Sequence, residues 1–297
     1  MLCFLRARKW RDTPGIGVAW KLGVACGLGL LTRSAFLPVI ACFGVFLLCV
    51  GDLVPGKRFR AVSGFVLPSI IAVVLVLLVN WVKWGLPLDF GHHGPREGFS
   101  TNPVVGLSGL LISPGKGLLF YAPVMLLPVL FSRRIRAAGS PEFFLTVVVT
   151  AVYLGIYGHW YDWGGGLSWG PRFLIPLIAP WMALTGRVLA NDSNPVARQL
   201  LIATAVPGAL VQFLGVAVYP HWIWAHTPPK PFSLTEPNIV LTARAFIEHG
   251  VDDLWVVSTG ASGHTVLLSA ILVLGATALG LITIVSRPGI FKESAVR

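Results

Sequence analysis

The uncharged stretch VSGFVLPSIIAVVLVLLVNWV (Val62–Val82) decides the fold class of this 297-residue chain. A bilayer core about 30 Å thick needs roughly 20 apolar residues in one helix, and this stretch is long enough to cross it. Seven further apolar runs occur along the chain: Val18–Leu31, Ala35–Val50, Gly117–Phe131, Phe143–Trp160, Phe173–Leu189, Leu200–Tyr219 and Thr265–Val285. The sequence therefore predicts an all-α, polytopic transmembrane bundle of about eight membrane segments, forming a single integral membrane domain over residues 1–297.

The overall composition argues against a soluble protein. Hydrophobic residues make up 55% of the chain and charged residues only 12%, whereas soluble domains carry roughly 25% charged residues. The first, second and fourth apolar runs are short. We therefore expect Val18–Val50 to form either two short spans or a re-entrant hairpin, broken at Thr32-Arg33-Ser34.

The distribution of charge predicts the orientation of the helices. If the N-terminus lies inside, 16 of the 23 Lys and Arg residues and five of the 12 acidic residues fall on the inner side. The outer side then has no net charge, and the whole formal charge of +11 faces the cytoplasm. Positive residues are retained on the cytoplasmic side of a membrane, so we expect both termini to be cytoplasmic. Because the basic residues are in short loops on one side, we expect no nucleic-acid partner.

Three regions are predicted to lie outside: residues 83–116, 161–172 and 220–263. Within the first, Val104–Ile112 is apolar but too short to span, and we expect it to lie along the membrane interface. The four cysteines are in the N-terminal tail and the first two apolar runs, which implies no disulfide framework. The expected location is a bacterial inner or plasma membrane, with membrane lipids as surroundings.

The segment GHWYDWGGGLSWGPRF (Gly158–Phe173) is the first candidate site. Its three consecutive glycines permit backbone conformations closed to other residues and let a ligand come close. Arg172 opens the next predicted helix, where a bound anion would relieve its conflict with the positive helix end. The alternative is a turn of interfacial tryptophans, Trp163 and Trp169, with a structural pair between Asp162 and Arg172.

Two further cations are candidates for an anion site. Lys116 lies between two glycines at the outer mouth of a predicted span, where it can contact a phosphate or serve as an anchor at the interface. Arg33 interrupts the first apolar stretch, and a charge at membrane depth is costly unless it faces protein or water. Lys116 and Arg172 on the same side make a stronger case for phosphate binding than either residue alone.

The sequence carries little support for a metal or a cofactor. His92 and His93 with Glu97 lack a third ligand at a recognisable spacing, so we expect a polar loop without a metal and no cofactor. A general base on the outer side must be a carboxylate, and the candidates include Asp162 and Glu97.

Three blocks of the sequence together resemble a known family. GLGLLTR (Gly27–Arg33), SPGKGLLFYAP (Ser113–Pro123) and WGGGLSWGPRF (Trp163–Phe173) are similar to motifs of bacterial membrane glycosyltransferases of the GT-C superfamily. The relatives in question are the protein O-mannosyltransferases and the aminoarabinose transferases.

The resemblance implies transfer of a sugar from a polyprenyl-phosphate donor on the outer face. It implies that Lys116, Arg172 and Arg33 hold the lipid phosphate as leaving group, with Trp163, Trp169 and Tyr121 as further substrate-binding residues. Members of the superfamily carry a catalytic carboxylate in their first external loop, which the turn Thr32-Arg33-Ser34 lacks. We therefore expect the chain to correspond to the C-terminal portion of such an enzyme, with Asp162 or Glu97 as the catalytic base.

Two alternatives to a complete enzyme remain open on the sequence. One is a non-enzymatic lipid carrier or transporter, although the paired repeats typical of transporters are not visible. The other is an inactive subunit that needs an N-terminal membrane partner.

Overall fold

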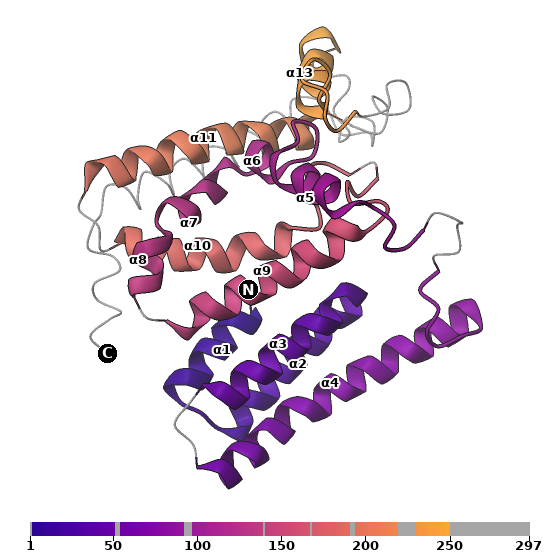
Figure 1. Ribbon diagram of the computed structural model, residues 1–297, viewed down its shortest axis with the longest axis vertical. Helices are drawn as coiled ribbons and strands as arrows, with labels where there is room; N and C mark the ends of the chain where they lie inside the picture. The colour runs from indigo at the N-terminus through magenta and orange to yellow at the C-terminus, as the bar shows by residue number, and fades with distance from the viewer. Residues whose placement is uncertain are drawn as a thin grey trace, which may run out of the picture. The chain divides into compact units, whose positions relative to one another are not determined.

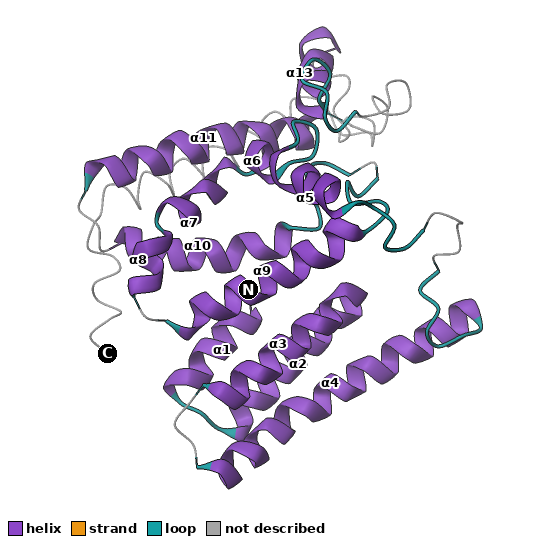
Figure 2. Ribbon diagram, viewed as in Figure 1, coloured by secondary structure: helices purple, strands orange, loops and turns teal. Residues whose placement is uncertain are grey.

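The computed structural model describes residues 2–50, 54–91, 97–138, 140–166, 168–190, 194–218 and 230–249, and these are helical with no strand among them (Figures 1 and 2). The all-α prediction is therefore confirmed for this part of the chain. The last apolar run, Thr265–Val285, and the C-terminus lie outside it. The helices are α1 (Leu2–Asp12), α2 (Ile16–Thr32), η1 (Ser34–Phe36), α3 (Leu37–Cys49), α4 (Pro55–Trp84), α5 (Pro103–Ile112), α6 (Leu118–Tyr121), η2 (Pro123–Met125), α7 (Leu126–Leu130), α8 (Ser132–Ala137), α9 (Pro141–His159), α10 (Ile175–Ala190), α11 (Pro195–Ala217) and α13 (Asn238–His249).

Three of the described helices are long and apolar enough to cross a membrane. They are α4 over Gly56–Trp84, α9 over Pro141–His159 and α11 over Pro195–Ala217. Along α4, large apolar side chains including Leu67, Ile71 and Leu78 remain about half exposed. A continuous exposed apolar face of this kind is unfavourable in water and suits lipid.

The described residues divide into two compact units. The first contains Met1–Pro103, Arg136–Tyr161 and Pro176–Pro180, and the second contains Val104–Ile135, Asp162–Ile175 and the residues from Trp181 onward.

The first unit is organised by the close packing of α2 against α4, which run side by side in Figure 1. A Cβ atom on Gly23 would collide with the Phe65 carbonyl oxygen, and one on Gly27 would lie 2.9 Å from Cβ of Ala72. Small residues four positions apart thus let the two backbones approach directly, as in packed membrane helices.

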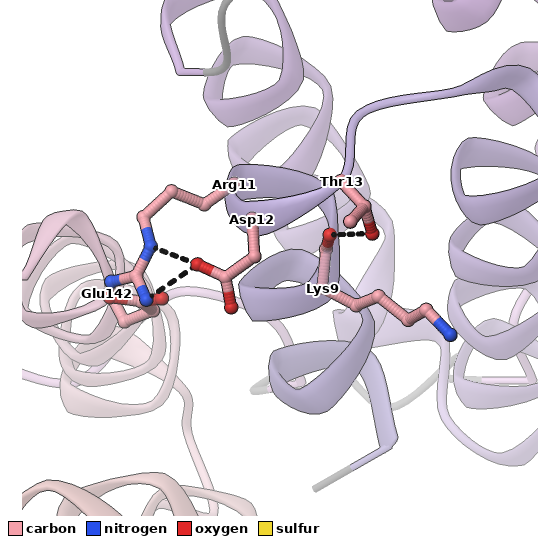
Figure 3. A network of polar contacts seen from close by, with 5 residues as sticks. All are labelled: Lys9, Arg11, Asp12, Thr13 and Glu142. Atoms are coloured by element: carbon pink, nitrogen blue, oxygen red, sulfur yellow. Dashed lines mark hydrogen bonds and ion pairs between the residues drawn. The ribbon is translucent and has the colours of Figure 1, made fainter. Parts of the chain in front are cut away.

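The residues before the first apolar run, expected only to be a basic tail, form a helix. In α1, Cys3, Ala7 and Trp10 share one buried face, and the Trp10 indole donates to the Val50 carbonyl at 2.6 Å. Figure 3 shows the polar contacts near the end of α1, where Arg11 forms an ion pair of 2.9 Å with Glu142 at the start of α9. An amphipathic face explains why this short basic segment folds onto the helices.

The predicted break after the first apolar run occurs where it was expected. Helix α2 ends at Thr32, Arg33 is extended, and the 3₁₀ turn η1 leads into α3. The Thr32 hydroxyl donates to the Gly29 carbonyl at 2.7 Å and so satisfies part of the helix end.

The expected single helix over Gly117–Phe131 is wrong. The run instead forms α6, η2 and α7 in succession. Pro123 has no backbone N–H and disfavours a helical conformation at the residue before it, and Ala122 accordingly has φ −143° and ψ 66°. Apolar composition alone did not reveal that proline divides the run into short pieces.

In the second unit, α6 and α13 both contact the long helix α11 (Figure 1). Val218 and Ala245 are buried there, with Trp169, Leu241 and Phe246 packed against them. Phe213 on α11 also meets Phe246 on α13, edge to face, with ring centroids 6.0 Å apart. The described part of the third predicted external region, residues 230–249, therefore belongs to the same unit as residues 162–172.

Candidate functional site

Two of the three consecutive glycines adopt conformations that a side chain would oppose. Gly165 and Gly166 have φ of +72° and +59°, in the left-handed region. The Asp162 carboxylate accepts from the Gly166 N–H at 2.7 Å, and the Asp162 carbonyl accepts from the Gly165 N–H at 2.9 Å. Asp162 therefore shapes the turn, and a Cβ on Gly165 would lie 2.9 Å from Nε of Arg172.

Lys116 reaches this loop from the turn between α5 and α6. Its ammonium group donates to the Gly166 carbonyl at 2.8 Å and also to the Ser168 carbonyl. The residue is only 2% exposed. Burial lowers its pKa to about 8, while the nearby Asp162 carboxylate opposes that shift and the Arg172 guanidinium adds to it.

Arg172 presents the second cation of the site, and its side chain is exposed. The guanidinium carbon lies 5.0 Å from the centroid of the Phe173 ring. Among the described residues, Arg172 does not pair with Asp162, whose carboxylate is directed to the Gly166 amide. Two cations and one carboxylate thus meet at the glycine loop, an arrangement that favours an anion.

Aromatic side chains enclose the loop on either side. Tyr121 is buried, donates to the Gly115 carbonyl at 2.8 Å, and meets Trp169 edge to face with centroids 5.2 Å apart. Trp163 covers Gly109 of α5 so closely that a Cβ there would collide with the indole ring, and it lies 5.8 Å from the Phe232 ring. The structure therefore brings together six predicted site residues: Lys116, Tyr121, Asp162, Trp163, Trp169 and Arg172.

Sequence reasoning missed the residues that complete this site from more distant segments. The Pro231 carbonyl accepts from the Gly115 N–H at 2.9 Å, and Gln212 of α11 donates to the Tyr121 carbonyl at 2.7 Å. Asn238 and Thr242, one turn apart on α13, are fully buried. Their i, i+4 spacing, which places both on one face of the amphipathic helix α13, was the one available signal.

Two predicted site residues belong to the first unit and are not part of this cluster. Arg33 lies over the Tyr157 ring of α9, with its guanidinium carbon 5.8 Å from the ring centroid. Glu97 is exposed, in a segment fixed to the end of α9 by the Thr101 hydroxyl, which donates to the Trp160 carbonyl at 2.8 Å.

The described residues contain no group of three His, Cys, Asp or Glu side chains able to hold a metal ion. His92 and His93 lie outside the described residues. Chemically, the cluster in the second unit is equipped to bind an anion at Arg172 beside a carboxylate and an aromatic wall.

A scan of protein-family models matched none of them to this chain, and searches of curated proteins and of solved structures likewise found no match. Function is therefore inferred from the geometry of the site and from the resemblance of the three sequence blocks.

Proposed function

We propose that the chain is a GT-C-like glycosyltransferase, corresponding to the C-terminal portion of such an enzyme. It would transfer a sugar from a polyprenyl-phosphate donor to an acceptor on the outer membrane face. The observation that carries this proposal is the meeting of Lys116 and Arg172, from separate segments, at the loop Gly164–Gly166.

The two cations have different roles in this proposal. Arg172 is exposed and its planar guanidinium suits two oxygens of a phosphate. Lys116 is enclosed by the carbonyls of Gly166 and Ser168, so it holds the loop in place and adds positive potential behind it. Stabilising the charge that develops on a leaving group is commonly the largest catalytic contribution.

The reaction has a simple balance of bonds. An acceptor hydroxyl attacks the anomeric carbon of the sugar, and the bond from that carbon to the phosphate oxygen breaks. The polyprenyl phosphate leaves with the electron pair, stabilised by Arg172, and the hydroxyl proton passes to a carboxylate. Asp162 is the candidate base within the cluster, and Glu97 or a carboxylate on an N-terminal partner subunit is the alternative.

The proposed topology has eight membrane segments and both termini in the cytoplasm of a bacterial plasma membrane, and two contacts within the first unit support the orientation of its helices. Arg11 and Glu142, both predicted to be cytoplasmic, form an ion pair. Arg33 and Tyr157, predicted at the outer side, lie together. A single cysteine placed at Glu97 should react with a membrane-impermeant thiol reagent added outside intact cells, and one placed at Arg198 should not.

The enzymatic proposal is tested with radiolabelled polyprenyl-phosphate hexose in membranes that contain the chain. We expect label to move to an acceptor fraction, and Arg172→Ala to reduce this at least a hundredfold, because phosphate charge is then uncompensated. Arg198→Ala is the matched control, since it removes an exposed arginine from the opposite predicted side. Equal transfer by the two variants would disprove the role of Arg172.

A cavity in the first unit favours a second candidate, a lipid carrier without chemistry. Its volume is about 310 Å³, and apolar side chains dominate its lining, including Leu28, Phe36, Val39, Val149 and Leu177. Such a cavity suits part of a polyprenyl chain. Movement of labelled lipid across liposome membranes without any new glycoside would favour this function over transfer.

A further inference from the structure

The inner face of α13 carries two buried polar side chains with unsatisfied hydrogen-bonding atoms. Asn238 and Thr242 are each 0% exposed. The carbonyl oxygen of the Asn238 side chain and the Thr242 hydroxyl have no hydrogen-bond partner in the described structure. Burying a polar group unsatisfied is costly, and most buried polar atoms in proteins are paired. Two such residues one turn apart on one helix face therefore call for an explanation.

Further unsatisfied groups lie in the loop that the same helix covers. The indole N–H of Trp169 and the hydroxyl of Ser168 are buried without a partner among the described residues. Trp169 packs against the buried cluster formed by Val218 and by Ala245 of α13. The Asn238 NH2 group faces the Tyr121 hydroxyl, which can accept from it while donating to the Gly115 carbonyl at 2.8 Å. The unpaired groups thus belong to adjoining segments of one cluster.

The chemistry of these groups indicates what they bind. An amide, two hydroxyls and an indole N–H offer both donors and acceptors, and none of them is charged. Sugars present hydroxyls that donate and accept, together with apolar C–H faces that pack on aromatic rings such as Trp169 and Tyr121. A phosphate, in contrast, has no donors to offer the Asn238 carbonyl oxygen.

We propose that Asn238 and Thr242 form a subsite that hydrogen-bonds the hydroxyl groups of the sugar, next to the phosphate position at Arg172. This inference rests on the proposed transferase function and adds the residues that recognise the sugar itself. Because both side chains are enclosed, the sugar enters when α13 moves away from Trp169. The contact that this movement breaks is a small apolar cluster. The bound hydroxyls then satisfy the polar groups that the helix otherwise buries unpaired.

The test uses the full chain in detergent with the double substitution Asn238→Leu and Thr242→Val. A subsite and a structural role predict opposite effects on the unliganded protein. For a subsite, the melting temperature stays constant or rises, since unsatisfied polar atoms are removed. Thr146→Val is the matched control and should lower the melting temperature, because Thr146 is equally buried but its hydroxyl donates to the Glu142 carbonyl at 2.7 Å.

Binding is then measured with two lipids, a polyprenyl phosphate and the corresponding polyprenyl-phosphate hexose. We expect the double variant to bind the hexose-bearing lipid about tenfold more weakly and the sugar-free lipid unchanged, because two neutral hydrogen bonds are lost. Arg172→Ala should weaken both lipids. Unchanged affinity for the hexose-bearing lipid, or a lowered melting temperature, would overturn the subsite while leaving the phosphate site intact. Failure of the wild-type chain to bind either lipid would overturn the proposed function and the subsite together.

Discussion

The α2–α4 contact in the first unit and the glycine loop in the second unit both depend on glycine, but for different physical reasons. Gly23 and Gly27 allow two apolar helices to approach until a Cβ atom would collide with the opposite backbone or side chain. Gly165 and Gly166 instead supply left-handed backbone conformations to the loop in which the Gly166 carbonyl accepts from Lys116. The first contact is periodic and apolar, whereas the second is assembled from polar groups on distant segments. Mutations should therefore damage the first through packing and the second through lost hydrogen bonds.

The largest effect that separates the two regions is expected for Gly23→Leu. The new side chain must displace the Phe65 carbonyl and Pro68 of α4, whose Cγ atom lies 2.6 Å from the place that the new Cβ would take. We expect a loss of about 3 kcal/mol or more of unfolding free energy, since overpacking of this kind moves backbone. Thermal unfolding in detergent measures it. Gly17→Ala, at a position with open space in the same helix, should be neutral or slightly stabilising.

The pH dependence of loop opening should distinguish the second region from the first. The pKa of Lys116 falls from 10.5 to about 8 on folding, so between those values the opened state binds more protons. Stability of the loop should therefore rise from pH 8 to pH 10.5, by about 3 kcal/mol at most, and be level below pH 8. Hydrogen exchange of the amides in residues 161–173 reports this opening. Amides of α2 should show no such trend, and a trend that survives Lys116→Met would exclude Lys116 as its origin.

Lys116→Met should loosen the glycine loop by about 1–2 kcal/mol at neutral pH. The substitution keeps the buried stem but leaves the Gly166 and Ser168 carbonyls without their donor. Exchange protection across residues 161–173 should fall accordingly. Lys230→Met is the matched control, because the pair of Lys230 with Glu236 is solvent-exposed and should contribute little to stability.

The smallest expected effect tests whether the first unit also contains a polar contact that matters. Arg11→Met leaves the Glu142 carboxylate, whose side chain is 5% exposed, without its 2.9 Å partner. We expect the packing of α1 onto the first unit to become less stable by about 1 kcal/mol. The rate of protease cleavage within α1 measures this loss. Asp12→Asn changes the exposed side of the same network and should leave the cleavage of α1 almost unchanged. Equal cleavage in both variants would show that Trp10 alone anchors the helix.

Much of the fold was predictable because bilayer-spanning helices are specified by local composition. The runs that became α4, α9 and α11 stand out by length alone, and the break at Arg33 follows from a charge within an apolar stretch. The division of Gly117–Phe131 was missed, since the conformational effect of Pro123 competes with hydropathy. The helix α1 was missed because its burial depends on Val50 and on Glu142, which is 131 residues away from Arg11.

The candidate site was predictable only in its residue types. Motif residues such as Lys116 and Arg172 were visible in the sequence, but their meeting at Gly165 and Gly166 was not. Asn238 and Thr242 lie in a region that the sequence predicted only to be external.

The sequence by itself determined that the chain is helical and rich in apolar runs of membrane length, because helix formation and hydrophobicity are properties of neighbouring residues. The tertiary structure alone decided which polar groups are buried, which cation is enclosed and which stays exposed. Burial and pairing of a side chain depend on segments far apart in the chain, and no local pattern encodes those distances.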